Sequence, residues 1–249
     1  MPPFFDAHCH VDPDSPPEAN TFPADSGNGR LLCGVDPADW PMVERFAAGW
    51  SGTLPAFGLH PWYAAEQPED WAEVLRRALH AHPAAWVGEI GLDTLKTSRA
   101  PEATQEQAFE TQLRLARELD RPVNLHCVKA YPKMLELLDR CYVADGPRTF
   151  LVHSFNGAHQ DIEKFRQRGA YFSIGPLASR HDTPRIRARV ALLPPERVVL
   201  ESDAFLCPGV DAEAELAYTV RCLADLGRES ETETWARVFD NSQRMCAND

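Results

Sequence analysis

The sequence predicts a (β/α)8 TIM barrel with an extra C-terminal helix, and three observations support that fold class. Eight short segments have the apolar character of strands. Amphipathic helix candidates alternate with them, and this order implies parallel strands joined by right-handed crossovers, which can close into a barrel. The length of 249 residues matches one barrel of this kind. We therefore expect a single domain over residues 1–249.

The strands and helices are predicted in the following order. The strands span residues 4–10, 31–35, 54–60, 86–92, 123–127, 150–155, 170–175 and 198–204. The helices between and after them span residues 39–48, 69–80, 102–119, 131–141, 159–168, 183–193 and 212–226. The clearest is 102–119, where Phe109, Leu113 and Ala116 form an apolar stripe. A last helix at 231–245 is expected to pack outside the barrel.

Residues 12–29 are rich in Pro, Ser, Asp and Gly, which predicts a long loop after the first strand. Loops that follow barrel strands carry binding and catalytic residues. We therefore expect this loop to lie at the catalytic mouth.

Charge and cysteine content narrow the class of protein. The chain has 25 Lys and Arg against 37 Asp and Glu, a net charge of −12, which counts against broad binding of nucleic acid. Seven cysteines without a Cys-x-x-Cys pair favour neither a disulfide framework nor a thiolate zinc site. The sequence shows no signal peptide and no apolar run long enough to cross a membrane. A soluble cytoplasmic protein is expected, with a monomer favoured and no contact with a membrane.

Histidines and acids fall at the predicted strand ends. His8 and His10 are two residues apart on one strand, so both imidazoles point to the same face, and neutral imidazole binds zinc, nickel and iron. Cys9 between them faces the opposite side and is expected in the core. Because reactive side chains of a barrel converge from the C-terminal ends of its strands, the other candidates are His60, Glu89, His126, His153 and Asp203.

Four imidazoles and two carboxylates around one mouth nearly complete the coordination of two divalent ions. Glu89 is the candidate bridge between a His8/His10 site and a His126/His153 site, because a carboxylate can bridge two ions. Asp203 would complete the first site and could accept a proton from water activated by the ions. Two dications leave about two positive charges beyond these carboxylates, which favours a phosphate or phosphodiester substrate.

Six motifs together resemble the TatD family of metal-dependent deoxyribonucleases, within the amidohydrolase-like metal-dependent hydrolases. They are residues 6–12 (DAHCHVD), 58–61 (GLHP), 88–93 (GEIGLD), 122–126 (PVNLH), 153–157 (HSFNG) and 201–204 (ESDA). The resemblance implies a hydrolase with two divalent ions held by His8, His10, Glu89, His126, His153 and Asp203. It also implies cleavage of DNA, often from the 3′ end, by metal-activated water, with Asp203 and Glu89 catalytic and His60 near the scissile phosphate. Zn, Mg, Mn, Ni and Fe all remain open.

Two departures from the family pattern bear on substrate. Lys129 follows the fifth-strand histidine where the family has an Arg, and Lys can hold a phosphate only as a point charge. The stretch after Asp203, residues 205–211, lacks the Arg and Asn that the family places there. The metal chemistry therefore transfers better than the identity of the substrate.

Three further acids lie on the same strand faces as predicted ligands. Asp6, Asp93 and Glu201 could each accept the second N–H of a ligand imidazole and orient it. The alternative for each is a hydrogen bond to neighbouring backbone.

Three functions remain open. The first is a two-metal phosphodiesterase, a 3′-5′ exodeoxyribonuclease acting on DNA ends or on a small anionic phosphoester. The second is a metal-dependent hydrolase of an ester or amide bond in a small anionic molecule or an acylated tRNA, because the same activated water could attack a carbonyl carbon. The third is a non-catalytic metal-binding module, for which Asp203→Asn would leave any activity unchanged.

Overall fold

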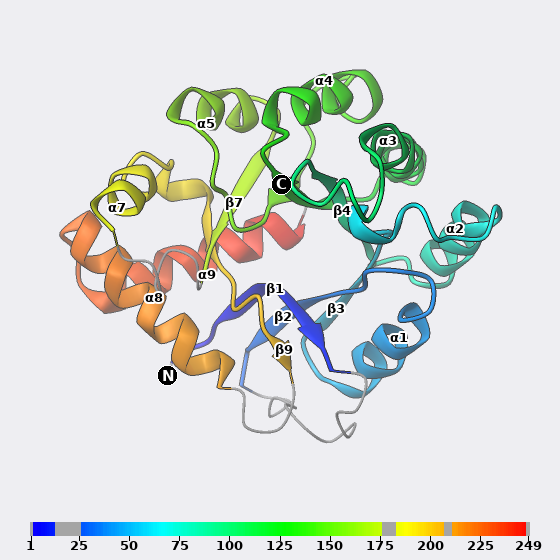
Figure 1. Ribbon diagram of the computed structural model, residues 1–249. Helices are drawn as coiled ribbons and strands as arrows, with labels where there is room; N and C mark the ends of the chain where they lie inside the picture. The colour runs from blue at the N-terminus through cyan, green and yellow to red at the C-terminus, as the bar shows by residue number, and fades with distance from the viewer. Residues whose placement is uncertain (1, 13–25, 176–182, 207–210, 248–249) are drawn as a thin grey trace.

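Eight parallel strands form a closed barrel in the computed structural model, which describes residues 2–12, 26–175, 183–206 and 211–247 (Figure 1). Neighbouring strands pair in the order β2-β3-β4-β5-β6-β7-β8-β1, and a β1–β2 pairing completes the circle. The strands are β1 (Phe5–Val11), β2 (Gly29–Cys33), β3 (Thr53–Phe57), β4 (Trp86–Asp93), β5 (Val123–Val128), β6 (Phe150–Val152), β7 (Ala170–Ile174) and β8 (Val198–Leu200). The predicted barrel is confirmed.

Helices surround the strands in alternation with them, as expected (Figure 1). They are α1 (Trp40–Gly49), α2 (Trp71–Ala81), α3 (Glu102–Glu118), α4 (Tyr131–Cys141), α5 (His159–Arg166), α7 (Pro184–Val190) and α8 (Ala212–Gly227), with α9 (Glu231–Ala247) as the extra C-terminal helix. The predicted stripe of α3 is buried at Phe109, Leu113 and Ala116. Within the described residues, no helix is long and apolar enough to cross a bilayer. Most of the loop predicted over residues 12–29 lies outside the described residues.

The barrel has an inner core and an outer core. Inward side chains such as Phe5, Trp86 and Tyr171 pack together at the N-terminal end of the barrel, and Met245 of α9 joins them. The outer cluster lies between strands and helices and includes Cys9, which is fully buried as predicted. The inner side chains therefore fill one end of the barrel and leave the other end for polar groups.

Five strands end earlier than the sequence predicted, β2 and β7 by one or two residues and the other three by three or four. β3 ends at Phe57, β6 at Val152 and β8 at Leu200, so His60, His153 and Asp203 lie in the segments that follow. A 3₁₀ turn, η1 (Pro61–Tyr63), begins directly after His60, and a second, η2 (Pro195–Arg197), precedes β8. A short strand that the sequence did not predict, β9 (Phe205–Leu206), pairs with the end of β1.

Candidate metal centre

The predicted ligands meet at the C-terminal end of the barrel around the carboxylate of Glu89. Its Oε2 lies 3.6 Å from Nε2 of His8 and 3.5 Å from Nε2 of His10. Its Oε1 lies 2.7 Å from Nδ1 of His126 and 2.9 Å from Nε2 of His153. The two oxygens of one carboxylate therefore face two different pairs of imidazoles.

Asp203 and His60 extend this cluster on opposite sides. Asp203 Oδ1 lies 3.7 Å from Nε2 of His8, and its side chain is 39% exposed whereas that of Glu89 is 4% exposed. His60 Nε2 lies 3.5 Å from Oε1 of Glu89, because its Nδ1 is held by the backbone N–H of Trp62 at 3.2 Å. Side-chain atoms close enough to share an ion occur in three overlapping groups, which are His8/Glu89/His153, His8/His10/Asp203 and His60/Glu89/His126.

His10 and His126 each have a polar partner on the nitrogen that points away from the cluster. His10 Nδ1 donates to the carbonyl oxygen of Cys33 at 2.9 Å, and His126 Nε2 lies 3.4 Å from Oδ2 of Asp93. Partners of this kind fix the tautomer and the orientation of a metal-binding imidazole. Asp93 therefore lies where the prediction places it, within reach of the second ring nitrogen of His126.

Glu201 lies beside His153, and its Oε2 is 3.6 Å from Nδ1 of the imidazole. It is fully buried and accepts a hydrogen bond from Ser173 Oγ. It faces the imidazole as predicted, but at a distance beyond a hydrogen bond.

The prediction for Asp6 was wrong. Its carboxylate accepts hydrogen bonds from the backbone N–H of Ser202 at 2.9 Å and from Ser202 Oγ at 2.6 Å, and it also contacts the backbone N–H of His8. Asp6 therefore ties β1 to the segment after β8 and orients no imidazole. The backbone alternative holds for this residue.

Asn124 is a partner that the sequence reasoning missed. Its amide contacts Nδ1 of His8, with Nδ2 at 3.0 Å and Oδ1 at 3.2 Å. The signal was present, because Asn124 lies two residues before His126 and so shares its strand face. The amide is fully buried, so the contact with His8 supplies a partner that water cannot.

Burial and neighbouring charge set the protonation of the cluster. Burial alone would raise the pKa of Glu89, but the imidazoles of His60 and His153 outweigh it and hold that pKa well below its usual value. Burial lowers the pKa of His8 well below normal, and it also lowers the pKa of His60. The pKa values of His10, His126 and His153 are instead raised, because neighbouring carboxylates outweigh the effect of burial. An ionised carboxylate and neutral imidazoles are the forms that bind a cation, so an ion bound by these three would displace protons.

A divalent cation fits this arrangement of donors. In its neutral form His10 donates through Nδ1 to Cys33 and carries a lone pair on Nε2, which lies only 3.0 Å from Nε2 of His8. The buried carboxylate of Glu89 lies beside both nitrogens. A cation among these atoms would give the lone pairs and the carboxylate a common partner.

The backbone around the cluster is held in unusual conformations. Lys129, Ser154 and Asp203 have φ values of 59°, 46° and 47°, in the left-handed region that L-residues rarely occupy. Each follows the end of a barrel strand. At Gly91, a Cβ would lie 1.9 Å from the carbonyl oxygen of His126, so only glycine permits β4 and β5 to approach here. Strained positions of this kind concentrate at functional sites.

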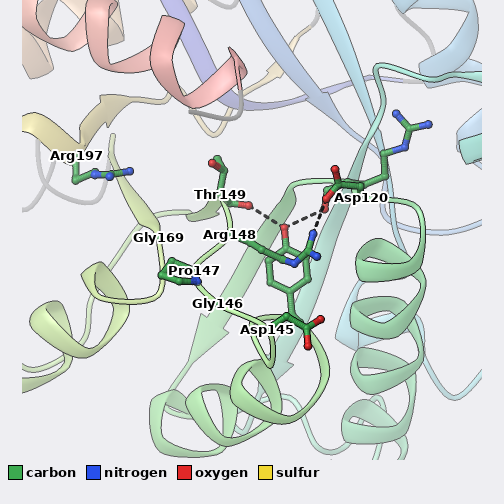
Figure 2. Close-up of a pocket in the computed structure, with 10 residues that line it drawn as sticks. Asp120, Asp145, Gly146, Pro147, Arg148, Thr149, Gly169 and Arg197 are labelled. Atoms are coloured by element: carbon green, nitrogen blue, oxygen red, sulfur yellow. Dashed lines mark hydrogen bonds and ion pairs between the residues drawn. The ribbon is translucent and has the colours of Figure 1, made fainter.

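A cavity of about 180 Å³ opens onto the cluster. It is lined by His126, His153 and Asp203 of the cluster and also by Lys129, Tyr131 and Asn156. A larger cavity of about 350 Å³ lies at the opposite end of the barrel, among residues that precede strands, including Arg148 before β6 and Arg197 before β8 (Figure 2). The larger cavity therefore has no part in the chemistry of the cluster.

Comparison with known proteins places the chain among related hydrolases. Residues 5–247 match the family model described as TatD related DNase. An uncharacterized metal-dependent hydrolase, YjjV of Escherichia coli (strain K12), is 33% identical over 97% of this chain and 97% of its own length. A 3′-5′ ssDNA/RNA exonuclease TatD of Citrobacter rodentium (strain ICC168) is 32% identical over 73% of this chain and 68% of its own length.

Solved structures agree. The crystal structure of YjjV, a TatD homolog from Escherichia coli K12, superposes with a TM-score of 0.80 at 26% identity over 97% of each chain. A TatD family hydrolase from Entamoeba histolytica gives a TM-score of 0.79 at 15% identity over 97% of each chain, which shows a shared fold. The chain belongs to the TatD related DNase family.

Proposed function

We propose that this protein is a two-metal exonuclease that hydrolyses phosphodiester bonds at the 3′ ends of single-stranded DNA. The observation that carries the proposal is the position of Glu89, whose two carboxylate oxygens face separate pairs of imidazoles. Bound divalent ions would polarise the phosphoryl oxygen and lower the pKa of water. The curated relative that is named as an ssDNA/RNA exonuclease supports this substrate class.

The roles of the residues follow from their positions. His8, His10 and Asp203 would hold one ion and His126 and His153 the other, with Glu89 between them. Asp203 is the most exposed of the clustered carboxylates and is placed to accept a proton from water at the mouth. His60, at the edge of the second group, would contact the scissile phosphate, and Lys129 at the rim of the cavity would hold it as a point charge.

Cleavage of a 3′-labelled single-stranded oligonucleotide, with Mg²⁺, Mn²⁺, Zn²⁺, Ni²⁺ or Fe²⁺ supplied in turn, tests the proposal. We expect release of the labelled 3′ nucleotide with at least one ion, and a fall in kcat of about 10²–10⁴ for Asp203→Asn because the proton acceptor is lost. Asp225→Asn, an exposed acid on α8, is the control that should retain activity.

Absence of cleavage with every ion would remove the nuclease proposal. Hydrolysis of small anionic esters, amides or acylated tRNA would then support the second function. Equal activity of the wild type and Asp203→Asn would instead contradict the catalytic role of this carboxylate.

A further inference from the structure

The indole ring of Trp62 lies beside the cluster of imidazoles and carboxylates and is hydrogen-bonded to Asp93, which also contacts that cluster. Trp62 Nε1 donates to Asp93 Oδ2 at 2.7 Å, and that oxygen also faces Nε2 of His126. The ring centroid of Trp62 is 5.0 Å from that of His60 and 6.2 Å from that of His126. The hydrogen bond to Asp93 holds the indole N–H of Trp62 against the cluster. Trp62 is half-buried, so part of the residue remains exposed to solvent.

Two exposed cations from the segment between β4 and α3 lie against this ring. Lys96 Nζ is 5.3 Å and Arg99 Cζ is 5.4 Å from the centroid of Trp62. In the described part of the chain, neither forms an ion pair with a carboxylate, whereas exposed arginines elsewhere do, such as Arg166 with Glu163. Leu95, beside Lys96, is 66% exposed.

This combination is unusual on a chain of net charge −12. An aromatic face with adjacent cations matches the requirements of single-stranded nucleic acid, because unstacked bases pack on aromatic rings while phosphates are held by Lys and Arg. A duplex would not offer its base faces. The position next to His60 and His126 places such a strand directly beside the groups that would act on it.

We propose that Trp62, Lys96 and Arg99 form a strand-binding subsite, in which a base packs on Trp62 and the flanking phosphates contact Lys96 and Arg99. The subsite holds nucleotides that neighbour the one being removed. This inference rests on the proposed nuclease function, to which it adds a site for the neighbouring nucleotides and a preference for strands of more than minimal length.

Binding can be measured separately from turnover in an Asp203→Asn background, by fluorescence anisotropy of a labelled single-stranded oligonucleotide. We expect Lys96→Gln/Arg99→Gln to raise Kd about tenfold and to reduce the salt dependence of binding, because two phosphate contacts are lost. Arg148→Gln/Arg197→Gln removes the same charge at the opposite end of the barrel (Figure 2) and should leave Kd unchanged. Melting temperatures of both variants check that each is folded.

A second pair of variants separates stacking from the hydrogen bond to Asp93. Trp62→Leu should raise Kd about tenfold, whereas Trp62→Phe keeps an aromatic face and should retain most of the affinity although it cannot donate to Asp93. In the otherwise wild-type enzyme, Lys96→Gln/Arg99→Gln should raise KM more for a long oligonucleotide than for a dinucleotide, with little effect on kcat.

The outcomes distinguish failure of this inference from failure of the proposed function. Equal Kd values for Lys96→Gln/Arg99→Gln, its control and the parent protein would overturn the subsite while leaving nuclease activity intact. Strand binding that depends on these residues, without cleavage by the wild type under any ion, would retain the subsite and reject the nuclease. Failure of the parent protein to bind the strand would overturn both.

Discussion

Glu89 is the residue on which the cluster depends, because it is a buried carboxylate surrounded by imidazoles. The pKa of His153 is raised well above its usual value, since the attraction of Glu89 outweighs the effect of burial, whereas the pKa of His8 is lowered by burial. Neighbouring imidazoles thus differ in the ease with which they lose a proton. Divalent ions would replace those protons and bring all of the imidazoles to the neutral form.

Asn124 provides a prediction at the scale of a single residue. Asn124→Ala removes the amide that meets Nδ1 of His8, so the imidazole loses the partner that fixes its orientation. We expect the affinity for divalent ions to fall about 10–100-fold, measured by competition with a chromophoric chelator. Asn156→Ala, at the rim of the cavity, is the matched control. Equal affinity in Asn124→Ala and the wild type would show that the Asn124 amide does not set the orientation of His8.

Two single residues show what strand parity could and could not predict from the sequence. Strand parity placed Asp93 correctly, because its neighbour His126 lies on the adjoining strand β5 and its partner Trp62 lies in η1, which follows β3. The same reasoning failed for Asp6, whose partner Ser202 is 196 residues away and reaches it only when β8 closes on β1. Parity gives the face of a strand, but it does not show which distant hydroxyl will arrive at that face.

At the scale of elements, α9 completes the barrel. Its Asn241 side chain donates to the carbonyl oxygens of Pro195 and Val198, which anchors the helix at the start of β8. Met245, one helical turn further on, packs among the inward-facing side chains of the strands. The C-terminal helix therefore does more than cover the outside of the barrel, which is all that the sequence predicted.

Met245→Ala tests this role of α9. The side chain is fully buried, so its truncation leaves a cavity in the inner core, and we expect the free energy of unfolding to fall by about 2–5 kcal/mol. Urea denaturation measures the change. Gln243→Ala, exposed on the same helix, should change stability by less than about 0.5 kcal/mol. A loss for Met245→Ala no larger than that of its control would place α9 outside the core.

The segment before α1 contains an acid whose pKa gives a pH-dependent prediction. Burial raises the pKa of Asp39 from 3.8 to about 6, although the backbone N–H of Val35, a donor 2.8 Å from the carboxylate, opposes the shift. Between these two values the folded state binds more protons than the unfolded state, so this residue makes stability fall as pH rises.

Asp39→Asn should abolish that contribution. The free energy of unfolding of the wild type minus that of Asp39→Asn is expected to decrease as pH rises from 3.8 towards about 6 and then to level off. Urea titrations of both proteins at several pH values measure this difference. A difference that stays constant or increases across the interval would contradict the raised pKa.

The strands themselves were predictable because each one is a short apolar run between polar segments, and their alternation with helices determines the barrel. The residues at which the strands end were not predictable, because the reactive side chains lie close to these ends. His153 directly follows the apolar run of β6, and Asp203 lies three residues after that of β8. The strands have ended at both positions, although the backbone N–H groups of His153 and Asp203 still donate to the carbonyl oxygens of Leu125 and His8. The left-handed conformations at Ser154 and Asp203 accompany these strand ends, and sequence pattern carries no signal for them.

At the scale of the whole molecule, one end of the barrel is filled by apolar side chains and the other gathers imidazoles and carboxylates. The net charge of −12 means that an anionic strand is repelled by most of the surface. Bound cations at the mouth, together with Lys96, Arg99 and Lys129 at its rim, would reverse that charge locally. Catalysis and substrate attraction would then depend on the same ions.

The metal content of the purified protein tests the central claim most directly. After equilibration with Zn²⁺ or Mn²⁺ and removal of free ions, elemental analysis should find about two ions per chain in the wild type. Glu89→Gln should lose at least one of them, because its carboxylate faces both groups of imidazoles, whereas Glu163→Gln on the exposed face of α5 should retain both. A wild-type protein that holds no stoichiometric divalent ion, or a Glu89→Gln variant with undiminished content, would contradict the account.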